Sequence, residues 1–322
     1  MGVSRRSADV AELVERARTG EARAIARLIT LVENDSPLLR VVAASLAAYA
    51  GHAQVIGLTG SPGVGKSTCT SALVAALRAD GRRVGVLAVD PSSPFSGGAL
   101  LGDRVRMQDH ATDDGVFIRS MASRGQLGGL SAAVPQALRV LDACGYEVIL
   151  IETVGVGQAE VEIASLADTT LLVVAPGFGD GIQAAKAGII EIADVFVVNK
   201  ADREGADQVA RDLRSMQSLG GRHSGPGAWR PPIVQTVASK GDGIRDVLDA
   251  IAKHRDWTLR HGELTRRRRA RAASEIEAIA LGQVRRRFAA VPGSAALDAA
   301  AARVAAGEID PYTAADELVG AL

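Results

Sequence analysis

The hydrophobic residues of this chain follow two different spacings, which separate a central part from two flanking parts. In the central part, short and nearly continuous apolar runs alternate with stretches of helical periodicity. Unbroken apolar runs are typical of parallel strands covered by helices on both faces, and the alternation indicates repeated strand–helix units. We therefore predict an α/β fold with a doubly wound, mainly parallel sheet. Strands are expected at 55–59, 84–89, 116–119, 148–151, 170–175, 195–198 and 233–237.

The two flanks show helical patterns only. Residues 8–50 carry apolar stripes at helical spacing, and further helical segments follow residue 256. One of these segments has a stripe with little else to pack against, made of Ile276, Ile279, Ala280, Val284 and Phe288. Such a face favours a second copy of the chain as its partner, so we expect a homodimer. The predicted parts are a helical extension (1–50), an α/β domain (51–255) and a helical dimerisation region (256–322).

Composition narrows the choice of partners. The formal net charge is zero, so no overall field favours nucleic acid or a membrane surface. Acidic residues nearby balance the arginine run at 266–271, which favours a solvated or partner-facing helix over a nucleic-acid site. The two cysteines lack the spacing of a metal or redox motif. We expect a cytoplasmic protein that binds neither nucleic acid nor a membrane.

A glycine-rich loop follows the first apolar run and leads into a helical stretch. Its spacing matches the phosphate-binding loop G-x-x-x-x-G-K-[ST]. Backbone N–H groups of such a loop point at phosphate oxygens, and the helix N-terminus adds positive charge. We expect Lys66 to reach the β- and γ-phosphates and Ser67 to bind Mg²⁺. The predicted nucleotide contacts in this loop are Gly60, Ser61, Gly63, Val64, Gly65, Lys66, Ser67 and Thr68.

Carboxylates are expected beside this loop. Asp90 and Glu152 each end an apolar run, and Asp103 lies in a glycine-rich stretch. Carboxylates at the carboxyl ends of parallel strands suit Mg²⁺, although Asp90 could instead start the turn at Pro91. Glu152 and Gly155 resemble the D-x-x-G switch of GTPases, with Glu in place of Asp and the glycine N–H near the γ-phosphate. The predicted metal site is Ser67, Asp90, Asp103 and Glu152; the predicted catalytic residues are Lys66, Glu152 and Asp103.

The sixth apolar run ends in Asn199-Lys200-Ala201-Asp202, which matches N-K-x-D. The Asp202 carboxylate can accept hydrogen bonds from both N1–H and the 2-amino group of guanine, whereas adenine has no such donor pair. Asn199 is expected to tie this loop to the phosphate loop, and the stem of Lys200 to cover the base. Ala238, Ser239 and Lys240 are predicted to add backbone contacts. The predicted ligand is therefore GTP or GDP.

A third glycine-rich loop, at 176–186, follows the fifth apolar run. It contains Asp180, Gln183 and Lys186. Two interpretations stand: a solvated helix end, or a further mobile loop in the row of strand ends that contacts a partner.

These motifs together resemble the MeaB/ArgK family, GTPases of the SIMIBI class. The matching strings are GSPGVGKST at 60–68, VDPSSPFSGGALLGDRVRM at 89–107, ETVGVGQAE at 152–160, APGFGDGIQAAKAGI at 175–189 and NKAD at 199–202. The resemblance implies a GTPase that forms a homodimer through its C-terminal helices. It implies a chaperone of a cobalamin-dependent acyl-CoA mutase, typically methylmalonyl-CoA mutase, that gates adenosylcobalamin loading and protects the loaded enzyme. The loop at 175–189 would signal to the mutase.

Alternatives stay open beside this hypothesis. A metal-inserting GTPase normally needs a cluster of Cys or His, and the five histidines are scattered along the sequence. A partitioning ATPase would place a lysine where Ser61 stands, and a transport-system kinase of the LAO/AO type would need a protein-substrate base that no motif marks. Val156 stands where many GTPases have a water-orienting glutamine, which favours slow intrinsic hydrolysis.

Overall fold

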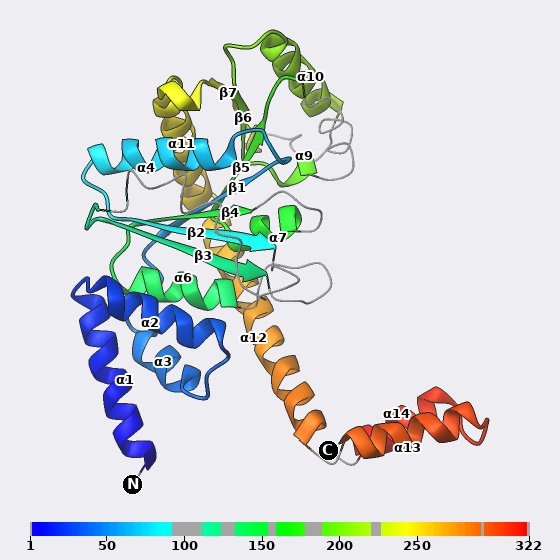
Figure 1. The fold of residues 1–322 in the computed structure, drawn as a ribbon. Helices are drawn as coiled ribbons and strands as arrows, with labels where there is room; N and C mark the ends of the chain where they lie inside the picture. The colour runs from blue at the N-terminus through cyan, green and yellow to red at the C-terminus, as the bar shows by residue number, and fades with distance from the viewer. Residues whose placement is uncertain are drawn as a thin grey trace. The chain divides into compact units, whose positions relative to one another are not determined.

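The computed structural model describes residues 2–91, 110, 112–123, 133–153, 159–177, 189–219, 227–290 and 293–320. The chain folds into two compact units, Met1–Arg268 and Arg269–Leu322 (Figure 1). The first unit contains the sheet and all the described residues of the predicted nucleotide site.

A seven-stranded sheet forms the centre of the first unit (Figure 1). Its strands are β1 (Gln54–Thr59), β2 (Val84–Pro91), β3 (Val116–Ser123), β4 (Val148–Thr153), β5 (Thr169–Val174), β6 (Val195–Asn199) and β7 (Ile233–Thr236). Their order is β3-β2-β4-β1-β5-β6-β7, and each neighbouring pair is parallel. The predicted strands are confirmed, and the sheet is parallel throughout. Strands β2, β3 and β4 lie on one side of β1, and β5, β6 and β7 lie on the other side. The strand order therefore reverses at β1, and ligands bind at the carboxyl end of the strand at such a switch point.

Helices cover both faces of the sheet. One face packs against α2 (Ala22–Glu33) and α6 (Ala133–Ala143), with α1 (Gly2–Arg18) and α3 (Leu39–Leu46) beside them. The other face packs against α4 (Lys66–Ala79) and α11 (Ile244–Arg260). The remaining helices of this unit are α7 (Ala159–Leu166), α9 (Ile189–Ile192), α10 (Ala206–Leu219) and the 3₁₀ helix η4 (Ala238–Lys240).

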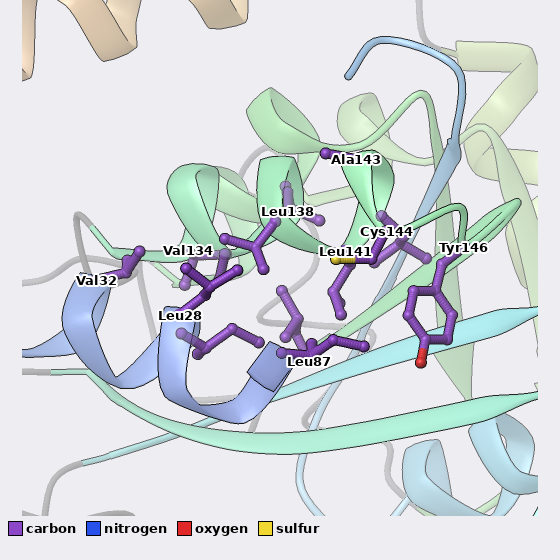
Figure 2. Close-up of a cluster of buried hydrophobic side chains, with 14 of the residues drawn as sticks. Leu28, Val32, Leu87, Val134, Leu138, Leu141, Ala143, Cys144 and Tyr146 are labelled. Carbon is purple, nitrogen blue, oxygen red and sulfur yellow. The ribbon is translucent and has the colours of Figure 1, made fainter. Parts of the chain in front are cut away.

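The side chains of β4 show why the strands carry unbroken apolar runs. Ile149 and Ile151 enter the cluster below α6, whereas Val148 and Leu150 enter the cluster below α4 and α11. Successive residues of a strand point to opposite faces, so a sheet buried on both sides needs apolar residues at every position. Figure 2 shows the first cluster, where Leu28 of α2 packs with side chains of α6. The N-terminal helices therefore share the core of the α/β domain.

The second unit is helical. It contains most of α12 (Glu263–Ala290), followed by α13 (Gly293–Ala305) and α14 (Pro311–Gly320). Asp310 caps α14, because its Oδ1 accepts the backbone N–H of Tyr312 at 2.9 Å and that of Thr313 at 3.1 Å. Among the described helices of the whole chain, none is long and apolar enough to cross a membrane.

Candidate nucleotide-binding site

The phosphate loop joins β1 to α4 at the carboxyl end of the central strand. Gly60 has a φ of 139°, and a Cβ placed there would lie 2.1 Å from the carbonyl oxygen of Val173. Gly65, the N-cap of α4, has a φ of 96°, and a Cβ there would lie 2.4 Å from Nδ2 of Asn199. Only glycine fits such positions without strain. The two glycines therefore let the loop pack closely against β5 and the N-K-x-D segment.

Lys66 begins α4 and is almost fully buried. Its ammonium group donates hydrogen bonds to the carbonyl oxygens of Gly60, at 2.7 Å, and Ser61, at 3.0 Å. The positive charge is thus held against the phosphate loop itself, at the N-terminal end of a helix, where anions bind.

Ser67 lies next to Glu152, the penultimate residue of β4. The Ser67 hydroxyl donates to Oε1 of Glu152 at 2.5 Å, and the Thr70 hydroxyl donates to Oε2 at 2.9 Å. All three side chains are buried. Burial, and after it the charge of Glu152, raises the pKa of the neighbouring Cys69 thiol to about 12, so this thiol stays protonated at neutral pH.

The donor set at Ser67 and Glu152 fits a magnesium ion. Mg²⁺ prefers oxygen ligands and is usually bound by one or two carboxylates together with substrate phosphates. Glu152 pairs with Ala88 in the register of β4 and β2, so Asp90 lies two residues further along the neighbouring strand, toward the same edge of the sheet. The two acidic residues thus end adjacent strands beside the phosphate loop.

Asn199 connects the segments expected to hold the base with the phosphate loop. Its Nδ2 donates to the carbonyl oxygen of Val64 at 2.9 Å, and its Oδ1 accepts the backbone N–H of Ala238 at 3.1 Å. The hydroxyl of Thr236 donates to the same Oδ1 at 3.2 Å. Since Asn199 is buried and bound on both sides of its amide, it holds three separate loops in one arrangement.

Lys200 and Asp202 lie on the exposed side of this arrangement. Lys200 has a φ of 57°, and its Nζ donates to the carbonyl oxygen of Gly63 at 2.6 Å. Asp202 Oδ2 lies 3.8 Å from Nζ of Lys240, with both side chains largely exposed. Ala238 and Ser239 precede Lys240 in η4. The Asp202 carboxylate is therefore an accessible acceptor beside the lysine stems.

Several predicted residues lie outside what the structure describes. These are Asp103, Gly155, Asp180, Gln183 and Lys186, together with the side chain of Asp90. Thr70 was not among the site residues predicted from the sequence. Its spacing could have indicated it, because residues three or four apart share a helix face, and Thr70 follows Ser67 and Lys66 by those intervals.

The parallel sheet, the phosphate loop at its switch point and the N-K-x-D segment bound to that loop define a P-loop GTPase. The family model described as "Methylmalonyl Co-A mutase-associated GTPase MeaB" matches residues 25–292. The chain therefore belongs to the MeaB family, which confirms the resemblance, and it is an enzyme that hydrolyses GTP.

Individual proteins show the same relationship. A Pyrococcus abyssi protein is 49% identical over 308 residues, which cover 96% of this chain and 95% of the relative. The mouse mitochondrial methylmalonic aciduria type A homolog is 39% identical over 216 residues, covering 66% of this chain and 52% of its own. The crystal structure of an LAO/AO transport system kinase has a TM-score of 0.71 at 28% identity and covers 97% of both chains. The similarity thus extends over nearly the whole chain.

Proposed function

We propose that this GTPase is a chaperone of a cobalamin-dependent acyl-CoA mutase, with methylmalonyl-CoA mutase as the first candidate. In this proposal it gates the loading of adenosylcobalamin and protects the loaded enzyme in the cytoplasm. The observation that carries the proposal is the match over residues 25–292 to a family whose description names that mutase. The mouse relative, named for methylmalonic aciduria, supports the same assignment.

The positions of the described side chains support the following nucleotide contacts in this proposal. Lys66 contacts the β- and γ-phosphates, exchanging its carbonyl partners for charge-assisted bonds. Asp202 accepts the guanine N–H groups, while the stem of Lys200 covers the base. Further contacts come from Gly60, Ser61, Gly63, Val64, Gly65, Ser67, Thr68, Gly155, Asn199, Ala238, Ser239 and Lys240.

The magnesium ligands in this proposal are Ser67, Asp90, Asp103 and Glu152. Bound there, Mg²⁺ would offset the charge of the β- and γ-phosphates. Ser67 suits this role because its hydroxyl has lone pairs for the metal and one proton for the Glu152 carboxylate.

The partner surfaces are a second proposal about the same chain. Asp180, Gln183 and Lys186 belong to the loop that we assign to the mutase, and the C-terminal helices form the homodimer. The support for the dimer is the apolar face of α12, where the side chains of Ile276 and Val284 are 68% and 51% exposed. Exposed apolar faces of this kind mark protein–protein contacts.

The decisive experiment measures GTP turnover with and without purified methylmalonyl-CoA mutase, together with the affinity of the mutase for the GTP and GDP forms. We expect GTP turnover to rise severalfold or more. We also expect the two affinities to differ, because linkage is reciprocal: if the mutase distinguishes the GTP form from the GDP form, its affinity depends on the bound nucleotide. Lys186→Ala and Gln183→Ala should reduce the stimulation and leave nucleotide affinity unchanged. Equal affinities without stimulation would contradict the proposal.

The same preparation distinguishes the alternatives. A transport-system kinase would transfer the radiolabelled γ-phosphate of GTP to a protein rather than to water. A metal-inserting GTPase would bind a transition metal tightly, and across the described part of the chain no group of three or more Cys, His, Asp and Glu side chains could hold one.

A further inference from the structure

We infer that Thr70 is a positioning residue that orients the Glu152 carboxylate for the magnesium site at Ser67. The inference rests on the proposed magnesium site and adds a residue that takes no part in binding the nucleotide or the metal. It concerns the second hydrogen bond to Glu152, which comes from one turn deeper in α4.

The two oxygens of Glu152 have different partners. Oε1 accepts the Ser67 hydroxyl at 2.5 Å, and Oε2 accepts the Thr70 hydroxyl at 2.9 Å. Ser67 and Thr70 are three residues apart on α4, so they lie on the same face of the helix. The carboxylate is therefore held at both ends by one rigid element, and its plane is set by the helix.

The Thr70 proton goes to the carboxylate. The Thr70 oxygen also lies 3.1 Å from the carbonyl oxygen of Lys66, but a hydroxyl has one proton to donate. A hydrogen bond to an ionised acceptor is shorter and stronger than one to a neutral carbonyl, and the 2.9 Å contact to Glu152 is the shorter of the two. Thr70 is 0% exposed, so water does not compete for this proton.

A glutamate needs such a second bond more than an aspartate would. Its additional methylene adds a rotatable bond, and holding a long side chain in one rotamer costs conformational entropy. In a helix the β-branched side chain of Thr70 is restricted to two χ1 rotamers, and in the structure its hydroxyl lies within hydrogen-bond distance of Glu152. If Ser67 turns its lone pairs to the metal, Thr70 still fixes the other carboxylate oxygen.

The test uses Thr70→Val, which keeps the shape and removes the hydroxyl, and Thr70→Ser, which restores it. Thr258→Val is the matched control, since Thr258 is also buried in a helix and its hydroxyl donates to the backbone carbonyl of Arg255 at 2.7 Å. The measurement is the dissociation rate of a fluorescent N-methylanthraniloyl GDP as a function of Mg²⁺ concentration. Affinity for the same GDP in excess EDTA, and thermal unfolding without nucleotide, are recorded for each protein.

We expect Thr70→Val to raise the half-saturating Mg²⁺ concentration roughly tenfold, the order associated with one hydrogen bond to a charged group. The affinity for GDP in EDTA should stay within about twofold of the wild-type value, because the hydroxyl that is lost makes no contact with the phosphates. Thr70→Ser should restore the Mg²⁺ dependence, and Thr258→Val should not alter it.

Other results overturn the inference in distinguishable ways. The same Mg²⁺ dependence in Thr70→Val and the unchanged protein would show that Thr70 does not position Glu152. If GDP binding is weakened equally with and without Mg²⁺, Thr70 maintains the conformation of the phosphate loop instead. If GDP dissociation from the unchanged protein ignores Mg²⁺, the magnesium site itself is wrong. Should Thr70→Val fail to fold, Thr70→Ala, which also lacks the hydroxyl, is judged by the same criteria.

Discussion

The guanidinium group of Arg267 donates two hydrogen bonds to the carboxylate of Asp194, at 2.7 and 2.8 Å. Asp194 directly precedes β6 and is 5% exposed. The next residue of α12, Arg268, donates to Asp168 at 2.7 Å, and Asp168 directly precedes β5. The first turns of α12 are therefore bound to the amino ends of two neighbouring strands. At the other end of β6 lies Asn199, which holds the phosphate loop.

Replacing Arg267 by alanine should destabilise the first unit strongly. Removing one partner of a buried ion pair typically costs about 3–5 kcal/mol, and we expect a loss at the lower end of that range because the backbone N–H of Thr170 still donates to Asp194 at 2.8 Å. Arg266→Ala is the matched control, because Arg266 lies on the same helix but its side chain is 69% exposed, and exposed charges in ion pairs contribute about 0–1 kcal/mol. The measurement is urea unfolding followed by tryptophan fluorescence. Trp229 is a suitable probe, since its indole N–H donates to the carbonyl oxygen of Asp194 at 2.8 Å. Similar losses of unfolding free energy in the two variants would show that the buried pair contributes no more to stability than the exposed one.

The same carboxylate predicts a dependence of stability on pH. Burial alone would raise the pKa of Asp194, but the hydrogen bonds from Arg267 and the proximity of His254, whose Nε2 lies 3.2 Å from Oδ1, outweigh it and lower the pKa from 3.8 to about 2. A group whose pKa is lower in the folded state stabilises it above the unfolded pKa and loses that contribution as the pH falls. We expect the ionised Asp194 to contribute about 2 kcal/mol at neutral pH and to lose this between about pH 4 and 2.

Asp194→Asn isolates this contribution from the other carboxylates. The difference in unfolding free energy between the unchanged protein and this variant should narrow as the pH falls below about 4. A difference that stays constant down to pH 2.5, or widens, would contradict the assigned pKa.

Lys66→Ala should abolish GTP hydrolysis and weaken GTP binding more than GDP binding, because the lysine is expected to contact the γ-phosphate. The loss in turnover should exceed about a hundredfold, as for other groups that stabilise developing charge. Lys200→Ala is a matched control, since Lys200 also donates to a phosphate-loop carbonyl, that of Gly63, at 2.6 Å. It should weaken GTP and GDP equally. Turnover assays and nucleotide titrations decide the matter.

The structure adds a further expectation for the Lys66 variant. Because Lys66 donates to Gly60 and Ser61, its removal should also lower the free energy of unfolding without nucleotide, by about 1 kcal/mol. A much larger loss would indicate that Lys66 serves mainly to hold the loop together.

Asp202→Asn should weaken GTP binding and improve the binding of xanthosine triphosphate. The carboxamide has a donor for the additional oxygen of xanthine and cannot accept both guanine N–H groups. We expect a loss of roughly ten- to a hundredfold for GTP, as for hydrogen bonds to a charged group. Asp207→Asn is the control, because this nearby carboxylate binds the surface residue Gln235 at 2.9 Å. An unchanged preference for GTP in the Asp202 variant would contradict the proposal that the N-K-x-D segment binds guanine.

A charge on the apolar face of α12 should dissociate the proposed dimer. Ile276→Asp buries a carboxylate in an interface if Ile276 lies there, which is costly without a partner. Ala278→Asp places the same charge on the opposite side of the helix and should leave the dimer intact. Light scattering of both variants over a range of concentrations tests this. A dimer that persists in Ile276→Asp would place the interface elsewhere.

Local patterns in the sequence determined the elements and most of the nucleotide site. Unbroken apolar runs specify strands buried on both faces, and β4 shows this directly, since alternate residues enter opposite clusters. The phosphate loop and N-K-x-D are recognisable because each places its functional groups within a few residues. The glycines at 60 and 65 are part of the same local pattern, because their positive φ angles strain any other residue.

Only the tertiary structure decided which distant residues complete the site. Thr70 meets Glu152 across 82 residues, and Asn199 meets Val64 across 135. Helix periodicity places Thr70 on one face with Ser67, but it does not say that this face lies against the end of β4. The arginine run at 266–271 was expected to be solvated or to face a partner, yet Arg267 and Arg268 bind buried carboxylates of the same unit. Charge in a sequence predicts solvation by default, and only a fold that brings opposite charges together at fixed geometry can bury it.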